Sequence, residues 1–154
     1  MIFVNEGEFK LAQPNDDLVH AGINSCVSIT VTYPNGERIG GHASLAPGVG
    51  QLGLQAILLG IMMSAALRNM VGATGIYVVG DLGSWPGQPG WPATGAAGLA
   101  NALGLPGVAV WSRDTEVLNL NHPTTVNAIF GQHPGRVLII ERTSDQHQLV
   151  NTTW

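Results

Sequence analysis

The sequence has little charge and almost no cysteine. Only 10% of the 154 residues are charged, where ordinary domains have about 25%. The net charge of −4 and the scattered positions of six Lys and Arg residues argue against nucleic acid as a partner, since phosphate binding needs grouped cations. The only cysteine is Cys26, which excludes an internal disulfide and a cysteine-rich metal site. We expect neither a metal nor a cofactor.

A long uninterrupted apolar run is also missing. The most apolar segment, residues 52–70, contains Gln55 and Arg68, whereas a membrane span needs about 20 consecutive apolar residues. Residues 1–10 lack the basic region and long apolar run of a secretory signal. We therefore expect a buried helix and no membrane partner. The expected location is the cytoplasm, or secretion as an effector without a Sec-type signal.

The composition is that of a chain with a substantial core. Apolar residues make up 45% of the sequence, and the length fits a single domain over residues 1–154. The periodicity of the apolar residues and the positions of Gly and Pro predict a series of strands and helices. Strands are expected within residues 1–10 and at 26–33, 37–45, 75–79, 108–111 and 136–142, helices at 49–70 and 96–103, and polar, irregular segments at 80–95, 112–135 and after 142.

The strand predicted at residues 26–33 has two different faces. Its residues alternate strictly, with Cys26, Ser28 and Thr30 on one face and apolar residues on the other. His42 lies sixteen residues after Cys26, on the strand predicted to pair with it. The first face is therefore polar and a candidate for chemistry, and the second face belongs to the core.

The turn between these two strands decides whether Cys26 and His42 meet. Pro34-Asn35-Gly36 favours a type I turn followed by a left-handed glycine, which is a three-residue hairpin loop. That loop pairs Ser28 with His42 and makes Cys26 its diagonal neighbour on the same face, about 7–8 Å away between Cβ atoms. A two-residue Asn-Gly turn would put the two on opposite faces. Gly40 and Gly41 would permit a bulge that re-aims the His42 ring.

A thiol beside an imidazole is the pattern of a cysteine nucleophile. Histidine accepts the thiol proton, and the thiolate of Cys26 attacks. Backbone N–H groups of the tight segment that contains Asn24 and Ser25 could face a developing oxyanion. The competing interpretation is a structural cysteine, because free cysteine often behaves as a small buried hydrophobe. The position of Cys26 on the polar face of its strand favours catalysis.

The motif Asn24-Ser25-Cys26, followed by a strand, a turn and the run from Gly40 through His42 to Ala43, resembles CheD, the chemoreceptor glutamine deamidase. CheD groups with the catalytic domains of cytotoxic necrotizing factor and of related lethal-factor deamidase toxins. The resemblance covers most of the chain at lower specificity, including the helix at 51–70 and the strand from Gly135 to Glu141. It implies an α+β fold, a β-sandwich of mixed sheets flanked by helices.

The resemblance also implies a reaction on a protein substrate with an exposed glutamine. Cys26 would attack the side-chain carboxamide and release ammonia, with His42 as base and then acid, and water would complete the deamidation. An amine in place of water would give transglutamination. The low charge favours an effector or toxin over a housekeeping regulator.

One catalytic position departs from the family pattern. The family often has a threonine six residues before the cysteine, where it helps to orient the histidine, and this chain has His20 there. His20 would hydrogen-bond the His42 ring, or a backbone carbonyl would take that role instead. The alternative interpretation of His20 is an exposed polar residue ahead of the strand.

Other candidates and functions stay open. Trp85 and Trp91 would line the rim of the cleft and grip a substrate loop, or simply pack within a surface loop. The spacing of His122, His133 and His147 matches no zinc pattern. A thiol protease or acyltransferase would use the same dyad, and a non-catalytic binding module would keep Cys26 in its core. The sequence does not indicate the oligomeric state.

Overall fold

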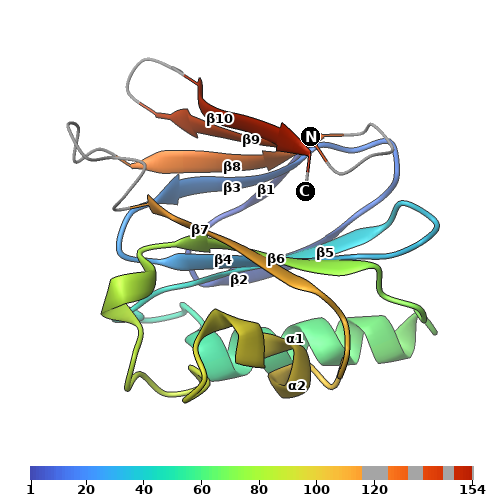
Figure 1. Ribbon diagram of the computed structural model, residues 1–154, viewed down its shortest axis with the longest axis horizontal. Helices are drawn as coiled ribbons and strands as arrows, with labels where there is room; N and C mark the ends of the chain where they lie inside the picture. Colours follow the sequence, from blue (N-terminus) through green and yellow to red (C-terminus); the bar gives the residue numbers. More distant parts are fainter. Residues whose placement is uncertain (116–124, 132–136, 144–147, 154) are drawn as a thin grey trace.

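The computed structural model describes residues 1–115, 125–131, 137–143 and 148–153. Figure 1 shows these residues in three layers, two β-sheets one above the other and a layer of helices below the second sheet. The described strands are β1 (Ile2–Val4), β2 (Glu8–Ala12), β3 (Leu18–Ile23), β4 (Val27–Thr32), β5 (Arg38–Ala43), β6 (Gly75–Gly80), β7 (Val110–Asp114), β8 (Val126–Phe130), β9 (Val137–Arg142) and β10 (Gln148–Thr153). The helices are α1 (Leu54–Leu67) and α2 (Leu99–Ala102), with short 3-10 turns at Leu82–Ser84 and Ala96–Gly98.

Both sheets are mixed. The first has the strand order β1-β3-β8-β9-β10 and the second β2-β5-β4-β6-β7. The pairs β1–β3 and β6–β7 are parallel, and the other neighbours are antiparallel. The helices lie against the outer face of the second sheet only (Figure 1). The α+β class, with two mixed sheets and few helices, is therefore confirmed.

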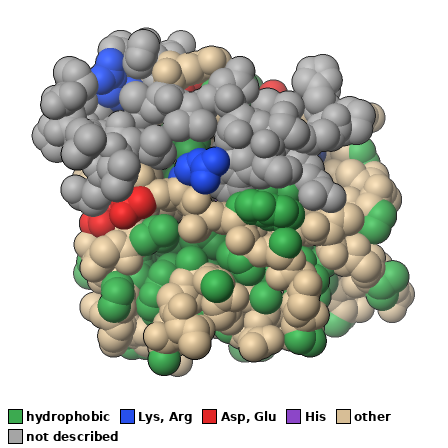
Figure 2. All heavy atoms as spheres, in the orientation of Figure 1, with side chains coloured by type: hydrophobic (Ala, Val, Ile, Leu, Met, Phe, Trp, Pro, Cys, Tyr) green, Lys and Arg blue, Asp and Glu red, His purple; other side chains and the backbone are tan. Residues whose placement is uncertain are grey.

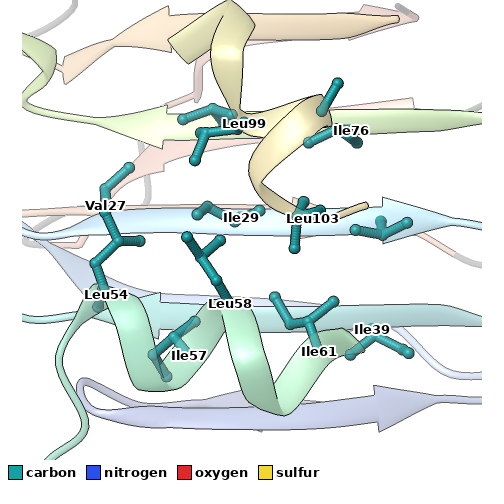
Figure 3. Packing of buried hydrophobic residues seen from close by; sticks show 14 of the residues in the cluster. Val27, Ile29, Ile39, Leu54, Ile57, Leu58, Ile61, Ile76, Leu99 and Leu103 are labelled. Atoms are coloured by element: carbon teal, nitrogen blue, oxygen red, sulfur yellow. The ribbon is translucent and has the colours of Figure 1, made fainter. Parts of the chain in front are cut away.

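The larger hydrophobic cluster lies between the second sheet and the helices. Figure 3 shows Ile29 of β4 and Leu58 and Ile61 of α1 among its members. These side chains are at most 5% exposed, so the helix is held mainly by apolar burial, worth about 25 cal/mol per Å². No helix in the described part of the chain is long and apolar enough to cross a membrane. On the surface seen in Figure 2, apolar side chains gather over this helical layer, and charged ones are sparse there.

The second interior lies between the two sheets and contains polar groups. Apolar side chains from both sheets form its core, including Val4, Leu18 and Val79. The same space holds fully or almost fully buried polar residues: His20, Ser28, Thr30 and His42. The polar face predicted for the strand at 26–33 is therefore an interior face that packs on the other sheet.

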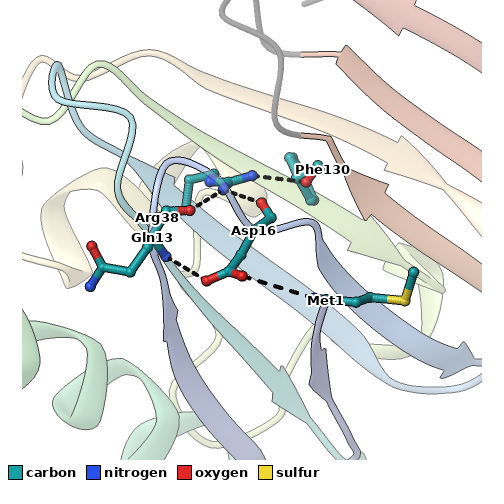
Figure 4. Close-up of polar contacts among 5 residues, drawn as sticks. All are labelled: Met1, Gln13, Asp16, Arg38 and Phe130. Atoms are coloured by element: carbon teal, nitrogen blue, oxygen red, sulfur yellow. Dashed lines mark hydrogen bonds and ion pairs between the residues drawn. The ribbon is translucent and has the colours of Figure 1, made fainter.

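Arg38 joins the two sheets at one end of this interior. Its guanidinium donates hydrogen bonds to the backbone oxygens of Gln13 at 2.7 Å, Asp16 at 2.5 Å and Phe130 at 2.8 Å (Figure 4). It also donates to the backbone oxygen of Gly131 at 3.1 Å. Burial lowers the pKa of Arg38, and the charges of Asp17 and Asp16 oppose that shift. Four carbonyl partners make this buried cation a structural clamp that joins β5 to the segment between β2 and β3 and to the end of β8.

Three strands were not predicted from the sequence. Residues 18–23 form β3, which continues through Gly22, at φ 68°, to Ile23 with an irregular register against β8. The segments predicted to be polar and irregular contain β8, which alternates between buried and half-buried residues, and β10, which pairs with β9. Short strands with polar flanks carry a weak periodic signal, and their pairing partners lie far away in the sequence.

Candidate functional site

The β4–β5 hairpin has the predicted register. Ser28 pairs with His42, and the turn is closed by hydrogen bonds from the Tyr33 N–H to the Glu37 oxygen and from the Gly36 N–H to the Tyr33 oxygen, both 3.0 Å. Gly36 has φ 89°, the left-handed conformation that the three-residue loop requires. The paired register ends at Val27 and Ala43, one residue after Cys26, and it rules out the two-residue turn.

The two glycines before His42 have a different role from the one predicted. The β4–β5 pairing contains no bulge. A Cβ atom on Gly40 would lie 2.8 Å from Cε1 of His20 in the facing sheet, and one on Gly41 would lie 2.3 Å from Cγ2 of Ile57 in α1. Each glycine thus permits a close approach on its own face of the sheet, and the His42 ring owes its direction to regular strand geometry.

Cys26 lies just before β4, where the chain passes from the first sheet to the second. Its side chain is 4% exposed, and Asn24 and Ser25 before it are exposed. Burial raises the pKa of the thiol to about 12, and the negative charge and hydrogen-bonding capacity of the Glu6 carboxylate add to the rise. The backbone N–H groups of Asn24 and Cys26 act in the opposite direction and favour the thiolate. At rest the thiol is protonated, and the two backbone N–H groups of Asn24 and Cys26 lie near its sulfur.

The His42 ring is buried and held by one nitrogen. Nδ1 lies 3.3 Å from the backbone oxygen of Val4, and Nε2 has no hydrogen-bond partner. Burial lowers the pKa of His42, whereas the Val4 oxygen, Glu6 and Glu8 raise it. The neutral ring is consistent with a proton on Nδ1, donated to Val4, and a free lone pair on Nε2. That arrangement suits a general base, although no hydrogen bond joins the imidazole to the Cys26 thiol in this resting structure.

His20 lies on β3 and is fully buried, so its interpretation as an exposed polar residue was wrong. Its Nε2 lies 2.6 Å from Oγ1 of Thr30, its Nδ1 has no partner, and its ring centre lies 6.3 Å from that of His42 in an edge-on arrangement. Burial, and then the charge of His42, hold the pKa of His20 well below its usual value. His20 makes no hydrogen bond to His42, and the backbone oxygen of Val4 occupies that position.

The two tryptophans lie together but differ in exposure. Trp85 is 2% exposed and donates its indole N–H to the backbone oxygen of Ser25 at 3.2 Å. Trp91 is half-buried, with its ring centre 5.9 Å from that of Trp85. Trp85 therefore supports the segment before Cys26 from inside the molecule, and only Trp91 of the pair has a ring open to solvent at the predicted rim.

Three residues near the site were not identified in the sequence analysis. Glu6 belongs to the β1–β2 turn, which reaches His42 only through long-range pairing. Val4 contributes a backbone oxygen, which side-chain patterns do not reveal. Gly80 pairs with Val27, and a Cβ atom there would lie 2.5 Å from the backbone oxygen of Cys26. A glycine at the end of a buried strand was the one visible sign of such a close approach.

The described part of the chain holds no group of three or more His, Cys, Asp or Glu residues that could bind a metal ion. His122, His133 and His147 lie outside the described residues. No protein-family model and no curated protein matches the chain. Fold and site together define an α+β protein of two mixed sheets, with one cysteine and two histidines buried at or between them.

Proposed function

We propose that this protein is a cysteine-dependent glutamine deamidase that acts on a protein substrate, with the fold of the CheD-like deamidases. The observation that carries the proposal is the state of His42. Its ring is fixed through Nδ1, its Nε2 is free, and the hairpin register pairs it with Ser28, two residues after Cys26. The resemblance of the Cys26 and His42 motifs to CheD supports the choice of glutamine as the substrate group.

The reaction begins from two neutral groups, because burial raises the pKa of the thiol and lowers that of the imidazole. The sulfur of Cys26 attacks the carbon of the substrate carboxamide. The Cys26 proton moves to Nε2 of His42 as the sulfur–carbon bond forms. His42 then gives this proton to the leaving nitrogen, and ammonia departs as the carbon–nitrogen bond breaks. Water, losing a proton to His42, hydrolyses the thioester to a glutamate side chain and restores the thiol.

The segment before Cys26 is the proposed oxyanion site. The N–H groups of Asn24 and Cys26 lie near the sulfur, where they favour negative charge. The indole of Trp85 fixes the backbone oxygen of Ser25, which limits rotation of this segment. Donors that are already oriented need no reorganisation when charge develops on the carboxamide oxygen.

Two other functions compete with this proposal. A thiol protease or acyltransferase would use the same dyad on a different carbonyl group. A binding module with Cys26 as a core residue is favoured by one observation, the 4% exposure of that side chain. Against the binding module stand the unpartnered nitrogens of His20 and His42, since an unsatisfied buried polar atom costs about 1–3 kcal/mol.

The test is incubation of the protein with a mixture of intact, glutamine-rich proteins. Ammonia release is measured together with peptide mapping of glutamine-to-glutamate conversion, in the wild type and in Cys26→Ser. We expect both signals in the wild type only, with no new peptide termini. New termini would indicate a protease, and amine incorporation without hydrolysis an acyltransferase. Equal ammonia release and equal peptide maps for both proteins, together with a Cys26 thiol that resists iodoacetamide in the folded state, would indicate the binding module.

A further inference from the structure

The β1–β2 turn is fastened directly to His42. The Gly7 N–H donates to the backbone oxygen of His42 at 2.7 Å, and the next residue, Glu8, pairs with His42 across β2 and β5. On the other side of the turn, the Val4 oxygen lies 3.3 Å from Nδ1 of the His42 ring. The turn therefore holds both the backbone and the side chain of the proposed base.

The turn is also held by its own hydrogen bonds and by the segment before α1. Gly7 has φ 81°, and its backbone oxygen accepts a hydrogen bond from the Leu52 N–H at 3.1 Å. A Cβ atom on Gly7 would lie 2.6 Å from that of Gln51, so no larger residue fits there. The Asn5 N–H donates to Oε2 of Glu8 at 3.0 Å, which closes the loop. The backbone of Glu6, between Asn5 and Gly7, is thus held by its neighbours.

Glu6 is the charged residue that this turn presents beside the thiol. It is exposed, and its carboxylate acts on both members of the dyad, disfavouring the thiolate of Cys26 and favouring protonated His42. The neighbouring acid, Glu8, forms an ion pair with Lys10 at 3.0 Å. Within the described residues no ion pair involves Glu6. An exposed carboxylate that forms no ion pair among the described residues therefore acts on a thiol that must itself become negative.

Resting on the proposed function, we propose that Glu6 selects substrates in which a lysine or arginine flanks the target glutamine, and that this cation activates the thiol by pairing with Glu6. The cation removes the repulsion between the Glu6 carboxylate and the developing thiolate. The proton of Cys26 then passes to Nε2 of His42 more readily. An acidic residue beside the glutamine would add to the repulsion and be disfavoured.

The first experiment needs no glutamine substrate. Alkylation of Cys26 by neutral iodoacetamide and by anionic iodoacetate is followed by intact mass in wild type, Glu6→Gln and Glu6→Asp. Glu37→Gln is the matched control, because it removes one negative charge at the far end of the same hairpin. We expect Glu6→Gln to react faster with both reagents and to lose roughly two- to fivefold discrimination against iodoacetate, the range of an exposed charge interaction. Glu6→Asp retains the discrimination.

The second experiment uses peptides that carry a diazoketone analogue of glutamine, flanked by lysine or by glutamate. Wild-type protein should label with a roughly two- to fivefold preference for the lysine peptide, and Glu6→Gln should show no preference. Unchanged alkylation and unchanged preference in folded Glu6→Gln would overturn the role of Glu6. If alkylation depends on the charge of Glu6 but no peptide labels the protein, the effect of Glu6 on the thiol stands and the deamidase proposal is rejected.

Discussion

The two faces of the β4–β5 hairpin are both buried, yet they have opposite chemistry. The face against α1 is apolar at its centre, with Ile29 and Ile39 in the larger hydrophobic cluster. The face against the other sheet carries Ser28 and His42, with His20 opposite. Apolar burial stabilises the first face, whereas unpartnered ring nitrogens weaken the second. Under the proposed function, the polar face between the sheets serves catalysis, and the face against the helix serves stability.

The largest expected effect concerns the polar face. His42→Gln removes the proposed base and should lower deamidase turnover by about 10²–10⁴-fold, the usual contribution of a general base. Turnover is measured by ammonia release, and circular dichroism checks the fold. Activity within a factor of two of wild type would show that His42 is structural and would make the two faces equivalent.

The helix-facing side should respond in the opposite way. Ile29→Ala leaves a cavity between β4 and α1 and should lower the free energy of unfolding by about 2–5 kcal/mol. Urea denaturation measures this loss, and the conservative Ile29→Val should cost less. The fraction that remains folded should keep its turnover per molecule. A selective loss of turnover in fully folded Ile29→Ala would contradict the division between the faces.

The polar face should also make stability depend on pH. Burial lowers the pKa values of His20 and His42 below 6.5, so the unfolded chain binds protons first as the pH falls. Their contribution is complete above pH 6.5 and decreases below it, by at most about 1.4 kcal/mol per pH unit for each group. His20→Leu removes one group and should flatten the dependence in urea titrations between pH 6.5 and 5. Parallel curves for the two proteins would show that His20 titrates normally.

The smallest expected effect concerns the turn that sets the register of both faces. Gly36→Ala forces a side chain into φ 89° and brings its Cβ to about 3.0 Å from Pro14, which should cost about 1 kcal/mol of stability. Thermal melts measure the loss, and Asn35→Ala serves as the comparison within the same turn. Because the register persists, turnover should remain near wild type. A stabilised Gly36→Ala would contradict the turn type.

The sequence predicted the hairpin well because its signals are local. The Pro34-Asn35-Gly36 turn and strict alternation in β4 sufficed to pair Ser28 with His42. The helix α1 followed from a long segment that is apolar almost all round and rich in helix formers, although it begins at Leu54, later than expected. The strands β8 and β10 were missed because their pairing partners are distant and their flanks are polar.

The site was predicted only where side chains alone define it. Cys26 and His42 were proposed from residue type and spacing. The orientation of His42, in contrast, depends on the backbone oxygen of Val4, which no side-chain pattern reveals. The interior position of His20 required β3 to be recognised and Gly40 to be seen as the space for its ring. Glu6 came to the site through the β1–β2 turn, a contact between residues far apart in the sequence.

The most direct measurement of the central claim is covalent labelling of Cys26 by a peptide that carries a diazoketone analogue of glutamine. Wild-type protein and His42→Gln are incubated with the peptide near neutral pH, and the adduct is mapped by peptide mass spectrometry. The account predicts one adduct, on Cys26, whose rate falls by at least about 10²-fold in His42→Gln. Absence of the adduct in wild type, or equal rates in both proteins, would contradict a reactive Cys26–His42 pair between the sheets.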